Sequence, residues 1–355
     1  MLCALIMAGG KGERFWPLST EEKPKQFLKL LGKDTMIQMT VKRLQKILPI
    51  DRIFVVTGEK YVELLKEQIP QLPQTNIIVE PVGRNTAPCA ALSALVIKKY
   101  YGDASIVVVP SDHLIVDEEK YLKIINVGED FVNKNSDSIV TLGITPDRAE
   151  TGYGYIKIDK YNNINNVEIH EDIKIHKVEK FVEKPSIEVA QEYLRDGDYL
   201  WNSGMFIWKA NYILKLTKKY LKNTYEVLNK LQETSGSEFY KVLSQKYKDV
   251  DNVSIDYGIM ENADNIHVIP ADFGWDDVGT WKSVERYREK DLNNNVQVGN
   301  IKYIDSCNNI VMGKNKPIIV VGLSDILVAE TDEVIFIGKK ENIDNIKEIK
   351  NKVIE

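Results

Sequence analysis

Short apolar runs alternate with longer amphipathic stretches through the first two-thirds of the chain. The runs are rich in β-branched residues and predict buried strands, at residues 2–7, 52–57, 76–81, 105–110 and 138–143. The stretches between them have apolar residues at helical spacing and predict helices, the clearest at residues 36–48 and 90–101. Buried strands that alternate with helices predict an α/β fold, with a Rossmann-like, mainly parallel sheet covered on both faces.

The pattern loosens after about residue 151. The stretches GYGYIKI (152–158) and KIHKVEKFVEK (174–184) predict strands, but no crossover helix separates them. Parallel neighbours need such a crossover, whereas antiparallel strands do not. We therefore expect a mixed sheet with inserted hairpins rather than a repeating strand–helix array.

A polar, Asn-rich stretch at 286–300 predicts a boundary between a domain over residues 1–285 and a small β-rich domain over 286–355. Strand-like runs separated by turn residues follow, at 297–303, 308–313, 317–322, 325–330 and 333–338. The tail, residues 341–355, has Ile and Val at helical spacing and predicts a terminal helix.

The composition is that of an ordinary globular protein. The 355 residues are 43% hydrophobic and 28% charged, and the net charge of -5 provides no general basic surface for nucleic acid. No apolar run approaches the ~20 residues of a membrane span, and the N-terminus does not resemble a signal peptide. Cys3, Cys89 and Cys307 are scattered without metal-ligand spacing, which is typical of reduced thiols. We expect a cytoplasmic protein that binds neither nucleic acid nor membranes.

The first apolar run ends in a cationic, glycine-rich loop, AGGKGERFWP (8–17). Glycines allow backbone N–H groups to gather around a phosphate, and Arg14 and Lys25 add the positive charge that a triphosphate requires. The spacing fits neither GxGxxG nor GxxxxGK[ST], and Pro17 and Pro24 interrupt any helix after it. The alternative is a solvated surface loop whose charges are incidental.

Two further motifs supply carboxylates. VVVPSDHLIV ends an apolar run at Asp112, and GWDDVGTW (274–281) contains Asp276 and Asp277. A carboxylate at the carboxyl end of a strand, near a phosphate loop, is a natural ligand for Mg²⁺. Turn-capping or solvated aspartates are the alternatives. His113 has no partner at metal-ligand spacing and is interpreted as structural.

A third polar set is typical of a sugar-phosphate pocket. FVEKP (181–185) and WNSGMFIW (201–208) provide a carboxylate and an amide for sugar hydroxyls and an ammonium for a phosphate. Glycines would let the backbone approach the ligand closely. The residues concerned are Glu183, Lys184 and Asn202, with Gly152, Gly154 and Gly204.

Nine motifs, in this order, resemble those of the sugar nucleotidyltransferase superfamily, and within it of the mannose-1-phosphate guanylyltransferases, or GDP-mannose pyrophosphorylases. They extend from residue 7 to 281 and read MAGGKGERFWPLS, KPKQF, EPVGRNTAP, VVPSDH, GYGYI, FVEKP, WNSGMF, DYGIME and GWDDVGTW. The resemblance implies a nucleotide-diphospho-sugar transferase fold with a left-handed β-helix-like C-terminal domain. It also implies that GTP and mannose 1-phosphate give GDP-mannose and pyrophosphate, with Mg²⁺.

Matched motif by motif, the resemblance implies roles at the nucleotide end. Arg14 and Lys25 would be catalytic, and Asp112 and Asp277 would bind Mg²⁺, with Asp276 as an alternative to the second. The triphosphate and its pyrophosphate leaving group would be held by Gly9, Gly10, Gly12 and Arg14, and the guanine edge would be bound by Glu80, Gly83, Arg84 and Asn85.

The resemblance implies a second set of roles at the sugar end. Lys184 would bind the 1-phosphate, and Asp256 in DYGIME would lie near the sugar. The mannose itself would be held by Gly152, Glu183, Asn202 and Gly204.

Three alternatives to guanylyl transfer remain. The pocket could take another nucleoside triphosphate or hexose 1-phosphate, or the chain could be a catalytically silent sensor of nucleotide sugars. A nicotinamide-dependent dehydrogenase is disfavoured because the GxGxxG spacing is absent. We expect a homodimer to which the β-rich tail contributes, and an enzyme without the phosphomannose isomerase domain of some homologues.

Overall fold

The computed structural model describes residues 1–10, 12–163 and 173–353, which form two compact units. The first unit consists of Met1–Gly9, Val41–Ser111 and Ile115–Trp275. The second consists of Gly10–Thr40, Asp112–Leu114 and Asp276–Glu355. The predicted boundary between a domain over residues 1–285 and one over 286–355 divides the sequence into two continuous pieces. The two units are instead made of several segments each, so this boundary stays a prediction.

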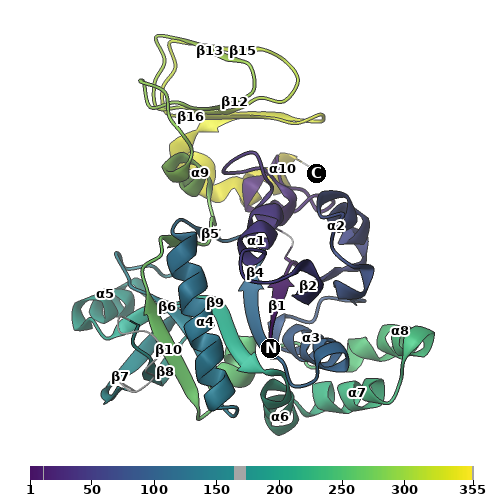
Figure 1. Ribbon diagram of the computed structural model, residues 1–355. Coiled ribbons are helices and arrows are strands. Elements are labelled where there is room, and N and C mark those ends of the chain that lie inside the picture. Colours follow the sequence, from purple (N-terminus) through teal and green to yellow (C-terminus); the bar gives the residue numbers. More distant parts are fainter. Residues whose placement is uncertain (11, 164–172, 354–355) are drawn as a thin grey trace. The chain divides into compact units, whose positions relative to one another are not determined.

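The first unit is built on a mixed sheet, which has nine strands within the described part of the chain (Figure 1). Their order is β3-β2-β1-β4-β9-β6-β10-β8-β7. β9 runs antiparallel to both of its central neighbours, β4 and β6, whereas β3, β2, β1 and β4 are mutually parallel. The strands are β1 (Leu2–Met7), β2 (Ile53–Gly58), β3 (Ile77–Glu80), β4 (Ser105–Pro110), β6 (Ile139–Ile144), β7 (Tyr155–Asn163), β8 (His176–Val182), β9 (Tyr199–Lys209) and β10 (Ile266–Ala271).

The five N-terminal strand predictions are confirmed to within one or two residues, whereas the run predicted at 152–158 forms a strand only from Tyr155 onward, as part of β7. The five N-terminal apolar runs correspond to β1, β2, β3, β4 and β6, whose side chains are almost all buried. The expected mixed sheet is also confirmed, because β7 and β8 form an antiparallel hairpin and β8 pairs antiparallel with β10. Runs buried on both faces are the strongest strand signal in a sequence, which explains the agreement.

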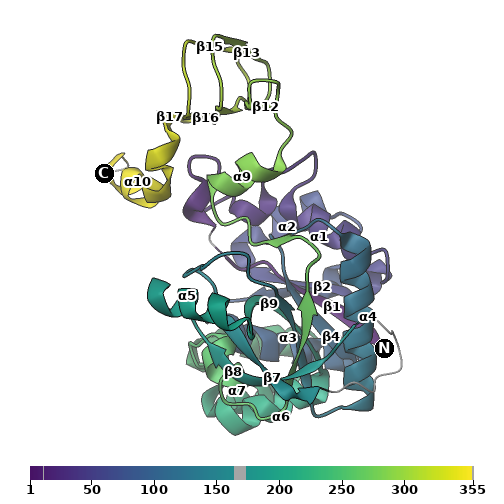
Figure 2. The ribbon, with the colours of Figure 1, turned by 90° about the vertical axis from the view of Figure 1, so that its left-hand side faces the viewer.

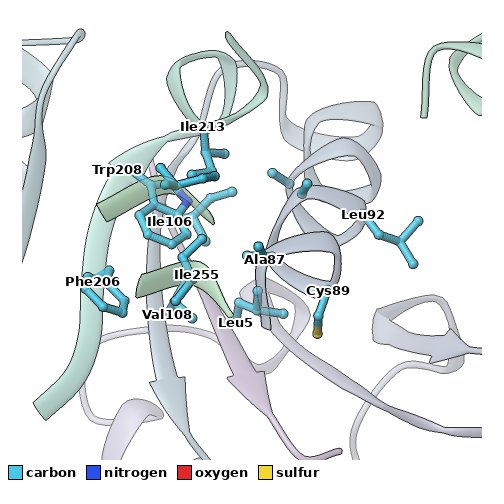
Figure 3. Packing of buried hydrophobic residues seen from close by; sticks show 14 of the residues in the cluster. Leu5, Ala87, Cys89, Leu92, Ile106, Val108, Phe206, Trp208, Ile213 and Ile255 are labelled. Carbon is cyan, nitrogen blue, oxygen red and sulfur yellow. The ribbon is translucent and has the colours of Figure 1, made fainter. Parts of the chain in front are cut away.

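Helices cover both faces of this sheet. Figure 3 shows Phe206 and Trp208 of β9 on the face that also carries Leu5 and packs against helix α3. The intervening Ile207 points to the opposite face, where it packs so closely against Gly128 of α4 that a Cβ there would have no room. The alternation of side chains along β9 therefore divides the core of the first unit into two layers.

Up to residue 246 the described part of the chain contains more helices than the two that the sequence pattern predicted most clearly. The predicted stretches 36–48 and 90–101 form α1 (Met36–Leu44) and part of α3 (Thr86–Tyr101). The others are α2 (Val62–Gln68), α4 (Glu118–Lys134), α5 (Ile187–Asp196), α6 (Ala210–Tyr220), α7 (Lys222–Gln232) and α8 (Gly236–Lys246). No helix within residues 1–10, 12–163 and 173–353 is both long and apolar enough to cross a membrane.

The C-terminal strands of the second unit coil in successive turns (Figure 2). β12, β14 and β16 stack in parallel, and β13 pairs in parallel with β15, so the domain is β-helix-like as expected. Asn295 and Asn309 are buried one above the other, and Asn309 donates to the Asn295 side chain at 3.0 Å. The strands are β12 (Val296–Val298), β13 (Ile301–Ile304), β14 (Ile310–Met312), β15 (Ile318–Val321), β16 (Ile326–Glu330) and β17 (Ile335–Lys339).

The core of the second unit joins the glycine-rich loop to the C-terminal strands. The Phe15 ring meets Trp281 edge-on at 5.5 Å, and Trp16 meets Phe336 of β17 in the same way at 5.7 Å. Two further helices flank the strands, α9 (Trp281–Tyr287) before them and α10 (Ile346–Val353) after them. The predicted tail helix is thus confirmed as α10, preceded by a 3₁₀ segment over Lys340–Asn345. The short strands β5 (Leu114–Ile115) and β11 (Trp275–Asp276) lie where the chain passes from one unit to the other.

Candidate functional site

The glycine-rich loop of the second unit lies against the segment that carries Lys25. Gly12 has a φ of +55°, and a Cβ there would lie 2.5 Å from the backbone nitrogen of Lys25. Gln26, the next residue, donates to the carbonyl of Gly10 at 3.1 Å. A side chain larger than hydrogen at position 12 would therefore separate the loop from Lys25.

Lys25 joins two motifs that are far apart in the sequence. Its buried Nζ lies 2.9 Å from Asp112 Oδ2 and donates to the backbone carbonyl of Asp277 at 2.5 Å. Burial by itself raises the pKa of Asp112, but the charge and hydrogen bond of Lys25 outweigh it together with the other groups around the carboxylate, so the pKa is lower than usual. The Asp112 carboxyl is therefore ionised at neutral pH and available to a cation.

Arg14 and the Asp277 carboxylate approach each other at Gly279. The Gly279 N–H donates to Asp277 Oδ1 at 3.1 Å. A Cβ on Gly279 would lie 2.8 Å from Asp277 Oδ2 and 3.1 Å from Arg14 Nη1. The exposed Arg14 thus lies near the carboxylate of Asp277, the residue whose backbone carbonyl accepts a hydrogen bond from Lys25.

The buried carboxylate of Asp276 is bonded to protein groups at both oxygens. Oδ1 accepts from the Val278 N–H at 2.7 Å and from the Ser283 hydroxyl at 3.0 Å. Oδ2 accepts from Arg286 Nη1 at 2.7 Å. These contacts hold the Asp276 carboxylate in the turn before α9.

The donor set of the second unit fits a cation that is completed by substrate. Within residues 1–10, 12–163 and 173–353 no three His, Cys, Asp or Glu side chains gather as a metal-binding group. Mg²⁺ commonly takes only one or two carboxylates and fills its remaining positions with water and phosphate oxygens. Lys25 contacts the Asp112 carboxylate and the Asp277 backbone, so two acidic residues lie beside one ammonium group. Burial lowers the pKa of the neighbouring His113, which favours a neutral imidazole.

Glu80 stands at the end of β3 in the first unit. It is buried, and its Oε1 accepts a hydrogen bond from the Tyr247 hydroxyl at 2.6 Å. A Cβ on Gly9 would lie 3.7 Å from Oε2, so Gly9, which follows β1 by two residues, lies beside this carboxyl. Burial raises the pKa of Glu80. Sequence reasoning did not identify Tyr247, which lies 167 positions away from Glu80.

The other predicted base-binding residues follow Glu80 on the loop before α3. Arg84 Nη2 donates to the carbonyl of Lys248 at 2.5 Å. Asn85 has a φ of +68°, and its side chain caps α3 by accepting from the Thr86 N–H at 2.9 Å. A Cβ on Gly83 would meet nothing within 4 Å, so the protein itself leaves space at that position.

The first unit brings together most of the predicted sugar-binding residues. Asn202 Nδ2 donates to Asp256 Oδ1 at 2.8 Å, and Asn202 Oδ1 accepts from the Gly204 N–H at 3.1 Å. A Cβ on Gly154 would lie 2.6 Å from Glu183 Oε2 and 3.5 Å from the Asn202 Cβ. Glu183, Asn202, Gly204 and Asp256 therefore form one cluster around Gly154.

Charged side chains of this cluster lie close to one another and to Lys184. Lys184, whose φ is +41°, lies 2.8 Å from Glu183 Oε1 through its Nζ. Burial, and secondly the charge of Glu183, raises the pKa of Asp256. A hollow of about 450 Å³ borders the cluster at Glu183 and Tyr257.

Gly152 is placed differently from the other predicted sugar residues. Its N–H donates to Glu150 Oε1 at 3.1 Å. Gly154, two residues later, occupies the central position instead, and its carbonyl accepts from the Asn202 N–H at 2.8 Å. Both glycines were candidates for close approach to a ligand, and side-chain packing around β7 distinguishes them.

Comparison with known families assigns this architecture. The nucleotidyl transferase family model matches residues 3–294. The chain belongs to the nucleotidyl transferase family. A second model, described as the mannoseP isomerase/GMP-like beta-helix domain, matches residues 299–353. The resemblance to sugar nucleotidyltransferases and the predicted fold class are confirmed.

The nucleotidyl transferase relatives extend over nearly the whole chain. "Mannose-1-phosphate guanylyltransferase 2" of Escherichia coli O157:H7 is 35% identical over 98% of this chain and 72% of its own length. "Mannose-1-phosphate guanylyltransferase" of Salmonella montevideo is 35% identical over 99% of this chain and 74% of its own length. A crystal structure described as "mannose-1-phosphate geranyltransferase" from Thermus thermophilus aligns with a TM-score of 0.85 at 30% identity, over 100% of this chain and 99% of that one.

The residues around Lys25 in the second unit and those around Glu80 and Asn202 in the first unit suit different parts of a nucleotidyl transferase's substrates. The second unit presents cations and carboxylates, which suit phosphates and a divalent ion. The first unit presents buried carboxyls and amides, which suit a nucleobase edge and sugar hydroxyls. The described side chains of neither set include an activated Ser, Cys or His, and a phosphate nucleophile requires none.

Proposed function

We propose that this protein transfers GMP from GTP to mannose 1-phosphate, giving GDP-mannose and pyrophosphate. A phosphate oxygen of mannose 1-phosphate attacks the α-phosphorus of GTP, and the bond from that phosphorus to the bridging oxygen of the β-phosphate breaks. Both reactants are anions, so the nucleophile arrives deprotonated and no base is needed. The names of the relatives at 35% identity support this choice of nucleotide and sugar.

The observation that carries the proposal is the contact of Lys25 with both Asp112 and Asp277. A buried ammonium held between two carboxylate-bearing motifs is oriented before substrate arrives, which is what electrostatic stabilisation of a transition state requires. Lys25 would neutralise charge at the α-phosphate. Arg14 would bind the pyrophosphate leaving group, together with the N–H groups of the glycine-rich loop.

The first unit supplies the groups that recognise the two substrates. Glu80, Gly83, Arg84 and Asn85 would bind guanine, and Gly9 would approach the nucleotide from the end of β1. Glu183, Asn202, Gly204 and Asp256 would bind mannose hydroxyls, and Lys184 its 1-phosphate. Gly152, also expected at the sugar, lies against Glu150, and Gly154 takes its place beside Glu183 and Asn202. Holding both reactants in line can contribute roughly 7–11 kcal/mol toward the barrier.

We also propose Mg²⁺ as the cofactor, held by Asp112 and Asp277. When bound, Mg²⁺ supplies positive charge to the phosphate oxygens and helps the pyrophosphate to leave. The ionised state of Asp112 and the full hydrogen bonding of the Asp276 carboxylate support this pair of ligands. Chelation should abolish turnover, and added Mg²⁺ should restore it.

A pyrophosphate-release assay with GTP, mannose 1-phosphate and Mg²⁺ tests the proposal. Replacing GTP by ATP or UTP, and mannose 1-phosphate by glucose 1-phosphate, tests the alternative of another nucleotide or sugar. A protein that binds GDP-mannose tightly but releases no pyrophosphate would be a sensor instead. We expect release with GTP and mannose 1-phosphate, and the highest kcat/KM for that pair.

We propose a homodimer formed through the C-terminal strands. Apolar residues are exposed there, with Ile319 63%, Ile335 59% and Ile337 65% accessible, beside a hollow of about 330 Å³. Deleting the tail would also remove core partners of Phe15, so Ile319→Asp with Ile337→Asp is the cleaner test. These substitutions should halve the mass measured by light scattering. An unchanged dimer would exclude this face.

We propose that the protein acts in the cytoplasm. Cys3, Cys89 and Cys307 are free thiols, as expected where thiols are kept reduced. Cell fractionation tests this location, and the enzyme should appear with cytoplasmic markers.

A further inference from the structure

One segment of the first unit contacts the residues proposed to bind guanine. It begins at Tyr247, directly after α8, and ends at Asp256. The Tyr247 hydroxyl donates to Glu80 at 2.6 Å. The carbonyl of the next residue accepts from Arg84 Nη2 at 2.5 Å. Two members of the base-binding set are thus bonded to adjacent residues of this segment.

The middle of the same segment is fastened to the start of α3. The Ala87 N–H donates to the carbonyl of Val253 at 3.2 Å. The Ile255 N–H donates to the Thr86 hydroxyl at 2.7 Å. Hydrogen bonds recur along the length of the segment. They therefore fix its position relative to the loop before α3 at several points and not at one.

Tyr247 and Glu80 form the most buried of these contacts. The Tyr247 side chain is fully buried, and Glu80 is 7% exposed. Losing a hydrogen-bond partner costs a buried carboxyl more free energy than an exposed one, so the Tyr247 hydroxyl, together with the Cys89 side chain that also hydrogen-bonds Glu80, holds this carboxyl in one orientation. With Oε1 on the tyrosine hydroxyl, Oε2 is turned toward Gly9 at the end of β1.

We infer that Tyr247 is a positioning residue for purine selection, whose hydroxyl orients the Glu80 carboxyl to accept hydrogen bonds from guanine. The inference rests on the guanylyl transfer proposed above. Guanine offers the N1–H and the 2-amino group as neighbouring donors. Hypoxanthine lacks the amino group, and adenine has an acceptor at N1, so a correctly aimed carboxyl discriminates among the three. Tyr247 acts through Glu80 and does not touch the reacting atoms.

Tyr247→Phe tests this role, because it removes the hydroxyl and keeps the ring. We expect kcat/KM for GTP to fall roughly tenfold, mainly through KM, as for loss of a hydrogen bond to a charged group. The value for inosine triphosphate should fall less, so the preference for GTP narrows. KM for mannose 1-phosphate should not change. Tyr220→Phe is the matched control, since it removes a hydroxyl that donates at 2.6 Å to the Asn262 carbonyl, and it should leave the preference unchanged.

Glu80→Gln and the double variant show whether Tyr247 acts through Glu80. We expect Glu80→Gln alone to narrow the preference for GTP, and the second substitution to add little. Equal losses with GTP and inosine triphosphate in Tyr247→Phe, or additive losses in the double variant, would overturn the inference. If Tyr247→Phe fails to fold, an unchanged preference in Glu80→Gln would also overturn it. A wild-type protein inactive with GTP contradicts the proposed function itself, which is a separate result.

Discussion

Gly12 and Lys25 are packed so closely that no side chain fits between them. A Cβ on Gly12 would lie 2.5 Å from the Lys25 backbone nitrogen and 2.7 Å from its Cβ. The backbone of Gly12 also has the positive φ of +55° that other residues adopt at a cost. This glycine therefore sets the position of Lys25, in addition to any contact that its N–H makes with a phosphate.

Glycine substitutions in this loop should separate packing from ligand binding. Gly12→Ala should lower the free energy of unfolding by about 1–3 kcal/mol and reduce kcat, because Lys25 is displaced. Gly10→Ala should keep the wild-type stability, since its Cβ would meet no protein atom within 4 Å, but should raise KM for GTP. Gly32→Ala, equally unobstructed, is the control for both. Denaturant unfolding and initial rates measure the two effects, and an unchanged KM in Gly10→Ala would mean that the loop does not meet the nucleotide.

Lys25→Ala should lose far more in turnover than in substrate binding. An ammonium that stabilises charge developing at the α-phosphate contributes mainly in the transition state, so kcat should fall by roughly 10²–10³. Equilibrium binding of GTP, measured by calorimetry, should weaken much less. Equal losses in both quantities would contradict the proposed role of Lys25. Thermal unfolding is the necessary control, because the substitution also removes the partner of Asp112.

The two aspartates of GWDDVGTW should respond in opposite ways to replacement by Asn. Asp277→Asn should raise the Mg²⁺ concentration for half-maximal activity by about tenfold or more and leave stability nearly unchanged. Asp276→Asn weakens the bond to Arg286 and should cost about 1–3 kcal/mol of stability, with the Mg²⁺ dependence preserved. Metal titrations and unfolding curves on both variants check this. The reverse pattern would make Asp276 the ligand.

Elements that are buried on both faces could be predicted from the sequence. The runs that form β1 and β4 are continuous and apolar. The first is followed by the glycine-rich loop, and the second by the polar residues Ser111 and Asp112. The motifs that contain Lys25 and Asn202 were also recognisable in the sequence, whereas the contact of Lys25 with the Asp277 carbonyl and that of Asn202 with Asp256 come from the fold.

Contacts between distant residues could not be predicted in this way. Tyr247 lies in a polar stretch without a motif, and only the fold brings it to Glu80. Phe15 and Trp281 appeared in separate motifs, yet they pack together in the core of the second unit. Hydrophobic periodicity reports which side of an element is buried, but not the partner against which it is buried.

Stability should depend on pH through His267 of β10. This side chain is 4% exposed, its ring lies 4.7 Å from Phe131, and Lys177 stands opposite it on β8. Burial, followed by the charge of Lys177, lowers the pKa of His267 to about 4. Between that value and the ordinary value near 6.5 the unfolded chain binds more protons, so stability should fall as the pH is lowered through this window, by roughly 3 kcal/mol at most.

His267→Leu should flatten that pH dependence, because the variant has no imidazole to protonate on unfolding. Urea unfolding at pH 4, 5, 6 and 7 measures the slope for both proteins. Parallel slopes would show that other groups determine the acid sensitivity.

Gly154 and Gly152 offer the sharpest test of the sugar cluster. A Cβ on Gly154 would lie 2.6 Å from Glu183 Oε2, which is the end of a flexible side chain, so the carboxylate should move while the fold persists. Gly154→Ala should therefore keep the melting temperature and raise KM for mannose 1-phosphate about tenfold, with KM for GTP unchanged. At Gly152 the nearest atom to a Cβ is Glu150 Oε1 at 3.3 Å, so Gly152→Ala should leave both constants near wild type. If Gly152→Ala alone raised KM for the sugar phosphate, the mannose would bind at the loop before β7 and not around Asn202.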